Sequence, residues 1–274
     1  MPDDNPILRH WQTEVQAFDQ NFTVLQSKMD IDAIHDLRVA IKKIHSYVKL
    51  YPSLFKKKEP EELLAMLRGL FSVFGKHRNI DIVRKLLPSF FEKNKPLPKS
   101  LFVYLHLLQD QITPYCKQIV QEFKKDEFNK FTNEVNQDFE KLDTAESQNA
   151  VKELIGSSMK TVTKDRKHFK KNSHLVRKNL KNIFYWSNIF DGEVFFTKPQ
   201  LKKLDKILDH LGNIQDHEVL RTNLKNFRKT ILSNTIKENE LIKKIETRAE
   251  KKKENLLARA DKMTEESISV LRKK

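Results

Sequence analysis

The sequence predicts an all-α protein. Its 274 residues include only five glycines and nine prolines, too few for the turns of a β-sandwich or barrel. Hydrophobic residues make up 38% of the chain, which argues against wholesale disorder. Apolar residues recur three and four positions apart almost throughout, which is the spacing of one helix face. A chain of this length can bury a sizeable core in one large domain or two small ones.

The expected helices form two sets of four, joined by an acidic, polar connector at about 126–146. Pro52, Pro60 and the KNKPLP stretch separate helices of the first set. In the second set, Ser173 is expected to cap one helix and Asp191-Gly192 to end it. The predicted ranges are 6–29, 31–55, 60–91 and 98–125, then 147–169, 173–190, 199–231 and 234–272.

Two regions are less clearly defined by their pattern. The connector has Phe128, Phe131, Val135 and Phe139 at the spacing of a short amphipathic helix, and its helical content is left open. The last helix keeps its apolar residues near one face from Glu240 onward. We favour an ordinary bundle helix there over a self-associating coiled coil.

The positive charge is concentrated in two segments. The net charge is +15, and residues 35–58 and 160–181 contribute +6 and +8 of it. Residues 1–34 and 122–153 each carry a net charge of −4. Two basic patches about 130 residues apart predict a single polyanion site, provided that the fold brings them together.

The first basic segment carries two parallel stripes of residues at helical spacing. The apolar stripe is Ile34, Leu37, Ile41, Ile44, Val48 and Tyr51, and either Asp30 or Asp32 can cap its start. The neighbouring stripe is His35, Arg38, Lys42, His45 and Lys49. Like charges at this spacing cost a few tenths of a kcal/mol per pair, so a bound anion would stabilise the helix. The alternative is a solvated face whose lysine stems cover apolar surface.

The second basic segment repeats the first. HLVRKNLKNI at 174–183 aligns with HDLRVAIKKI at 35–44, an offset of 139. LGNIQDHEVL at 211–220 aligns with FGKHRNIDIV at 74–83, an offset of 137. Two matches in the same order at nearly the same offset predict an internal duplication.

These strings resemble the motifs of the CHAD domain, the conserved histidine α-helical domain. The resemblance covers about residues 5–272, with copy one at about 5–125 and copy two at about 147–272. It implies two four-helix bundles, related by a pseudo-two-fold axis, around a basic central channel. It also implies binding of inorganic polyphosphate and, in some members, association with polyphosphate granules.

The resemblance and the basic stripes together give the candidate polyphosphate ligands. They are His35, Arg38, Lys42, Lys43, His45, Lys49, Arg68, Arg78, Lys170, His174, Arg177, Lys178 and Lys181. Asn79 stands where the family commonly has an acid, and the second copy has Gln215-Asp216, so the charge contributed by these two helices is in question. We expect Asp216 to orient or pair with the channel lysines.

The two motif histidines have two interpretations. Next to phosphate, His35 and His174 are expected to gain protons, because negative charge stabilises imidazolium. The alternative is a neutral, hydrogen-bonded histidine at the edge of the core. Binding that is flat between about pH 5.5 and 8 would contradict the first interpretation.

Other functions are weaker on the sequence. Nonspecific DNA or RNA binding fits a pI near 9.6, but no helix-turn-helix, RRM, KH or zinc-finger signature is present. Phe184, Tyr185 and Trp186 have core spacing and are expected to be buried rather than to stack on bases. A scaffold role would use the Lys56–Lys58 and Lys251–Lys253 runs, which are more typical of solvated helix ends.

An enzyme acting on polyphosphate is also a weaker alternative. Metal-assisted phosphoryl transfer needs clustered carboxylates, and the E-x-E-x-K signature of the CYTH triphosphatases is missing. No P-loop is present, and His210 and His217 have no evident third metal ligand. We therefore expect no catalytic residue, metal or cofactor.

The remaining expectations concern redox state and location. The only cysteine, Cys116, excludes an internal disulfide and is expected to be a small residue in the core or at its boundary. No transmembrane or signal segment is visible, so we expect a cytoplasmic protein with no membrane contact.

Overall fold

The computed structural model describes residues 5–91, 98–190, 192–230 and 236–271, and every regular element in these ranges is helical. The all-α prediction is confirmed. The elements are α1 (Pro6–Ser27), α2 (Ile31–Val48), α3 (Tyr51–Phe55), α4 (Glu61–Leu86), the 3-10 turn η1 (Leu87–Phe90), α5 (Lys99–Gln121), α6 (Lys125–Phe139), α7 (Thr144–Arg166), α8 (Phe169–Ser187), α9 (Lys198–Thr230) and α10 (Ile236–Leu271).

The main differences from the predicted helices concern the region of Pro52, the start of α8 and the connector. The helix expected over 60–91 also ends at Leu86 and continues as η1, and the one expected from 147 begins at Thr144. The helix expected over 31–55 is interrupted after Val48, because Pro52 has no N–H to donate to the Val48 carbonyl. Pro52 lies instead in the first turn of α3, where proline is tolerated. Ser173 caps nothing, since α8 already begins at Phe169. The connector contains a full helix, α6. Residues 93–97, Asp191 and the expected helix ends at 231, 234 and 272 lie outside the described residues.

The N-cap of α2 is Asp30, one of the two capping residues that the sequence predicts. Asp30 accepts hydrogen bonds from the backbone N–H groups of Asp32 and Ala33, which satisfies two donors of the first turn. The predicted apolar stripe of this helix is buried from Ile34 to Val48. The basic stripe beside it therefore has a fixed direction relative to the core.

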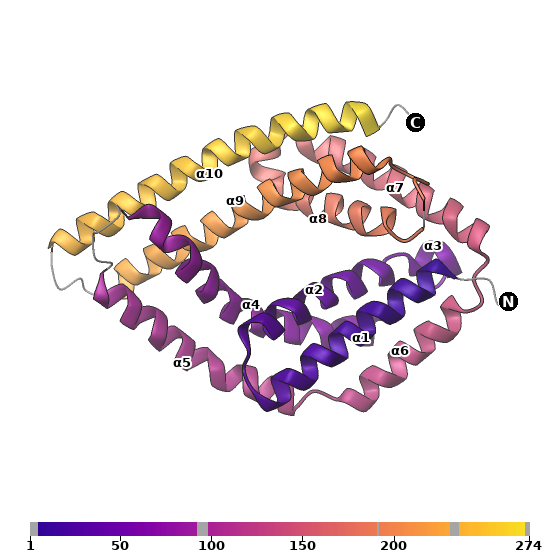
Figure 1. Cartoon of the computed structure of the whole chain (residues 1–274), viewed down its shortest axis with the longest axis horizontal. Coiled ribbons are helices and arrows are strands. Elements are labelled where there is room, and N and C mark those ends of the chain that lie inside the picture. Colours follow the sequence, from indigo (N-terminus) through magenta and orange to yellow (C-terminus); the bar gives the residue numbers. More distant parts are fainter. Residues whose placement is uncertain (1–4, 92–97, 191, 231–235, 272–274) are drawn as a thin grey trace.

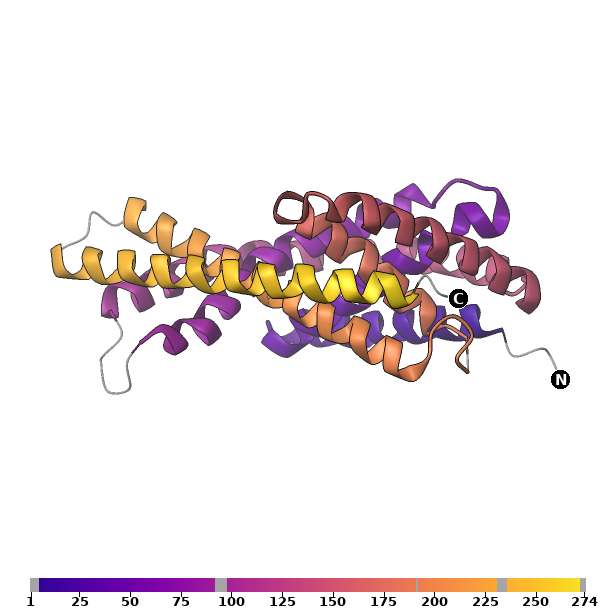
Figure 2. The same cartoon turned by 90° about the horizontal axis from the view of Figure 1, so that it is seen from above.

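The helices pack largely as neighbours in the chain. α1 packs on α2, α4 on α5, α7 on α8 and α9 on α10. The first half contacts the second at several places: α4 lies against α9, α2 against α8, α3 against α7 and η1 against α10. Figures 1 and 2 show the two longest helices, α9 and α10, running side by side along the long axis of the molecule.

The core is divided along the length of the molecule and not at the connector. The larger cluster of buried side chains draws on α1, α2, α6, α7 and α8, together with parts of α4, α9 and α10. The smaller cluster, the distal core, lies at the left end of Figure 1 and combines Val83 of α4, Leu105 of α5, Leu224 of α9 and Ile245 of α10. The internal duplication itself stays a prediction.

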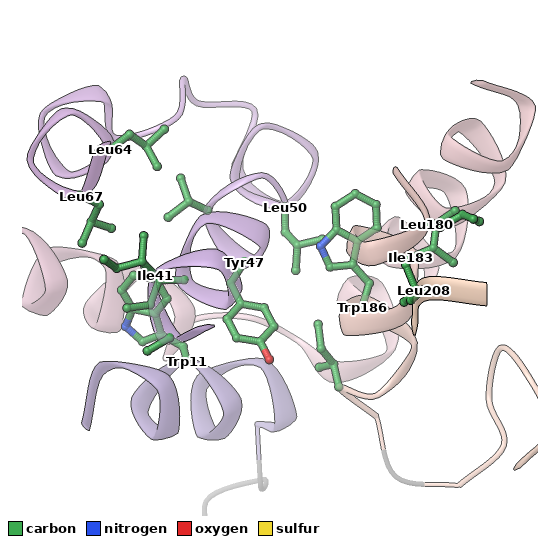
Figure 3. Packing of buried hydrophobic residues seen from close by; sticks show 14 of the residues in the cluster. Trp11, Ile41, Tyr47, Leu50, Leu64, Leu67, Leu180, Ile183, Trp186 and Leu208 are labelled. Atoms are coloured by element: carbon green, nitrogen blue, oxygen red, sulfur yellow. The ribbon is translucent and has the colours of Figure 1, made fainter. Parts of the chain in front are cut away.

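The contact between α2 and α8 is anchored by Trp186. Its indole Nε1 donates to the backbone carbonyl of Ser46, 2.9 Å away, in a fully buried setting. Figure 3 shows this indole facing Leu50, just beyond the end of α2. The anchor fixes how the two basic helices lie against each other. Across the described ranges, no helix has both the length and the hydropathy needed to span a bilayer.

Candidate functional site

A cavity of about 290 Å³ lies where α2, α4 and α8 meet. Its polar lining comes from both basic segments, which the fold brings together. The basic residues around it are Lys42, His45, Lys49, Arg68, His174, Arg177, Lys178 and Lys181. No carboxylate is among its lining residues. We call this space the first groove.

Arg38 is fixed beside the first groove by α4. Its guanidinium donates to the backbone carbonyl of Phe71 and lies 3.9 Å from the centre of the Phe71 ring. Burial and the nearby Arg78 lower the pKa of Arg38 to about 10. Gly75 makes room for this arrangement, since a Cβ there would lie 2.9 Å from Arg38 Nη1.

Lys42 has the most perturbed environment of the basic stripe. Burial, followed by the charge of Lys181 and then of Arg38 and Arg177, lowers the pKa of Lys42 to about 7. Burial, Arg177 and Lys43 lower the pKa of Lys181 to about 8. In the described part of the chain, neither Lys42 nor Lys181 forms an ion pair. The two ammonium groups therefore lie in a positive field, and no carboxylate of the described residues pairs with them.

The rim of the first groove is built by residues from three helices. His45 has a lowered pKa because of burial and then of Lys49 and Lys178. The pKa of Lys49 is lowered by burial and by Lys178 as well. Lys178 and Arg68 are exposed, and Arg68 lies 3.6 Å from Glu61 in a solvent-exposed pair worth little energy. The rim can therefore turn its charge toward a ligand at small cost.

His35 and His174, the two motif histidines, are both exposed. Partial removal from water and the charge of Arg78 lower the pKa of His35, so its imidazole is mainly neutral without a ligand. His174 lines the first groove. Their expected protonation next to phosphate stays a prediction.

Asp216 is a carboxylate whose pKa is influenced by the basic residues of this region. Burial raises its pKa, against the opposing charges of Arg177 and Arg78 and, more weakly, of Lys42. The direction shows that desolvation outweighs the attraction of the cations. Asp216 therefore offsets only part of the positive charge, and its expected role as an orienter or ion-pair partner of the channel lysines stays a prediction.

Five of the thirteen candidate ligands do not line the first groove: His35, Arg38, Lys43, Arg78 and Lys170. Two of them have acidic partners of their own. Lys43 donates to the buried carboxylate of Glu14, 2.7 Å away, on the side of α2 that faces α1. Lys170 lies 3.4 Å from Glu254 of α10 and lines a separate surface hollow. The stripe pattern could not exclude either residue, because both ion-pair partners are distant in sequence.

The sequence did not single out Phe71 and Tyr185 as site residues. The ring of Phe71 makes cation–π contacts with Arg38 and Lys42, and the Lys42 Nζ is 5.5 Å from the ring centre. Tyr185 carries Lys181 at 5.6 Å. Such contacts stabilise a cation away from water by about 0.5–2 kcal/mol. The one available signal was the position of Phe71, one helical turn before Gly75.

A family model described as the CHAD domain matches residues 8–225. The chain belongs to the CHAD domain family. A crystal structure of the CHAD domain from the plant Ricinus communis superposes with a TM-score of 0.72 at 15% sequence identity. That match covers 97% of this chain and 91% of the plant chain, so the shared fold extends beyond the residues of the family model. A comparison with curated proteins gave no match.

The side chains that could bind a metal ion do not form a ligand set in the part of the chain that the structure describes. Within the described ranges, no three histidine, cysteine or acidic side chains are grouped so as to hold a metal ion. Cys116 is free and fully buried, and burial raises the pKa of its thiol to about 11. It packs in the core, as expected.

Proposed function

We propose that this CHAD domain binds inorganic polyphosphate in the first groove and catalyses no reaction on it. The observation that carries the proposal is the state of Lys42 and Lys181. Burial and the neighbouring cations, Arg177 among them, destabilise both ammonium groups. A bound polyanion would offset this destabilisation. Family membership supports the same ligand class, because the CHAD resemblance implies polyphosphate binding.

The chemistry of the lining suits a phosphate chain. Arginine offers paired donors to phosphate oxygens and lysine offers a mobile point charge. Polyphosphate has no bases, so it needs charge along a groove and no aromatic stacking platform. The rings of Phe71 and Tyr185 are in contact with Arg38 and Lys181, so these faces are not open to stack on bases. This supports polyphosphate over a nucleic acid. The lack of a carboxylate in the lining supports binding without metal-assisted hydrolysis.

The test is a titration of long-chain polyphosphate at about 150 mM salt, with DNA and RNA of matched charge as competitors. The binding variant combines four alanine substitutions: Arg38→Ala, Lys42→Ala, Arg177→Ala and Lys181→Ala. A control variant loses the same charge at exposed positions outside the groove: Lys117→Ala, Lys130→Ala, Lys152→Ala and Lys160→Ala.

We expect polyphosphate binding to survive nucleic-acid competition, to collapse in the binding variant and to persist in the control variant. Equal loss in both variants, or equal binding of every polyanion, would contradict the proposal. In that case the basic stripes would be a charged surface with no selectivity. A location in the cytoplasm, at polyphosphate granules, is part of the proposal and follows from the ligand.

A further inference from the structure

A second groove, of about 380 Å³, lies on the other side of the α2–α8 contact, where these helices meet α9. Arg177, Lys181 and Tyr185 line both grooves. The second groove adds Lys43 and three carboxylates of α9: Asp205, Asp209 and Asp216. These carboxylates follow one face of the helix, four and then seven residues apart.

The offsets of the predicted duplication relate the two grooves residue by residue. With the offset of 137 between α4 and α9, Arg68 corresponds to Asp205, and Phe71 to Leu208. With the offset of 139 between α2 and α8, His45 corresponds to Phe184. By the same offset, the cation at Lys178 has its counterpart at the apolar Val39. In three of these four pairs, a cationic or histidine residue of the first groove (Arg68, His45 or Lys178) is matched by an acidic or apolar residue of the second.

The charge of the two linings differs accordingly. Six lysines and arginines and no carboxylate line the first groove. Three lysines and arginines and three carboxylates line the second. One of those three cations, Lys43, is already paired with the buried Glu14 at 2.7 Å. Asp205 and Asp209 are exposed, at the mouth of the groove.

We infer that this chain binds polyphosphate on one side of the α2–α8 contact only, and that Asp205 and Asp209 exclude the phosphate chain from the second groove. The inference rests on the proposed function and specifies it further. A phosphate chain entering the second groove meets like charge at the mouth, and the cations it could reach there, Arg177 and Lys181, are equally available from the first groove, where no carboxylate opposes it. Asp205 and Asp209 are thus specificity residues that act by repulsion.

The test uses inorganic tripolyphosphate, because a short ligand lets calorimetry count sites per chain. The opening variant combines Asp205→Arg, which copies Arg68, with Asp209→Ser, which copies Ser72. Both positions are exposed, so the fold is expected to survive, and helical circular dichroism checks this. We expect one tripolyphosphate per chain for the parent and two for the opening variant.

A control variant adds the same charge away from both grooves, at the exposed positions Glu153→Arg and Glu140→Ser. We expect it to keep one site, with a modest gain in affinity from the added charge. The reverse substitution, Arg68→Asp, puts the repulsive residue into the first groove. It should weaken tripolyphosphate binding about tenfold.

The outcomes separate the two proposals. A parent that binds two tripolyphosphates would overturn the inference and leave the proposed function standing. An opening variant that keeps one site, with an Arg68→Asp variant that binds like the parent, would also overturn the inference alone. A parent that binds no polyphosphate would overturn the proposed function and the inference with it.

Discussion

Replacing Lys42 by methionine should stabilise the ligand-free protein while removing a central binding group. Methionine keeps the length and volume of the lysine stem and leaves out the ammonium. In the native protein that ammonium is disfavoured by burial and by the cations of α8 and α4. Most substitutions of buried residues lower the unfolding free energy, whereas Lys42→Met is expected to raise it.

The magnitude follows from the pKa. Lowering the pKa of Lys42 from 10.5 to about 7 corresponds to about 5 kcal/mol, since one pKa unit is worth about 1.4 kcal/mol. Relaxation around the charge and the lost contact with Phe71, worth about 0.5–1 kcal/mol, reduce this figure. We expect a net gain of about 2–4 kcal/mol in unfolding free energy at pH 7, or about 3–7 °C in Tm for a chain of 274 residues.

The pH dependence has a defined direction. Above pH 10.5 Lys42 is neutral in both states and costs nothing. As the pH falls from 10.5 to about 7, only the unfolded state takes up the proton, so the parent loses stability, and below about 7 the penalty is constant. The advantage of Lys42→Met should therefore be full at pH 7 and much smaller at about pH 10.

Urea unfolding of the two proteins at both pH values measures this difference. The exposed Lys152→Met variant is the matched control and should behave like the parent. Saturating tripolyphosphate should stabilise the parent more than the variant, because the variant lacks one of the groups that bind phosphate. The difference in unfolding free energy between the two proteins should therefore become smaller. A Lys42→Met protein that is less stable than the parent at pH 7, or whose advantage does not change with pH, would refute the reasoning.

Three further predictions concern the ligand. Polyphosphate affinity should rise as the pH falls from about 8.5 to 6, with net proton uptake on binding, because phosphate raises the lowered pKa values of Lys42 and Lys181; calorimetry in two buffers of different ionisation enthalpy measures the uptake. The logarithm of the affinity should fall linearly with the logarithm of salt concentration, and a flat salt dependence would argue against binding by charge. Gly75→Ala should weaken binding severalfold by displacing Arg38, whereas Gly212→Ala, with its nearest neighbour at 3.8 Å, should bind normally and gain about 0.5–1 kcal/mol of stability from helix propensity.

The fold was largely predictable because its information is local. The buried stripe of α2 and the cap at Asp30 were both read from spacing and residue type. Ends were harder to place, since they depend on packing. Ser173 is a good cap residue that lies inside α8, where tertiary contacts outweigh its preference. The acidic composition of the connector masked α6, although its phenylalanines had the right spacing and Phe128 and Phe139 are fully buried.

The site was predictable only in part, because its electrostatics come from contacts between distant segments. The stripe containing Lys42 could be read from the sequence, but the burial that lowers its pKa depends on α4 and α8. Lys43 has the same residue type one position away, and its charge is taken up by Glu14, 29 residues earlier. Motif resemblance assigns both lysines to the ligand, whereas the ion pair distinguishes them.

The composition of the distal core has a consequence for the order of folding. Its side chains come from the ends of α4 and α5 and from α9 and α10, which are separated by more than a hundred residues of chain. During synthesis, the exposed apolar ends of α4 and α5 must wait for the last helices to leave the ribosome. A nascent chain ending near residue 225, where the family model stops, would lack Ile242, Ile245 and Ala249 and keep that surface open. α10 thus covers the apolar ends of α4 and α5, and these ends stay exposed to aggregation until α10 has been synthesised.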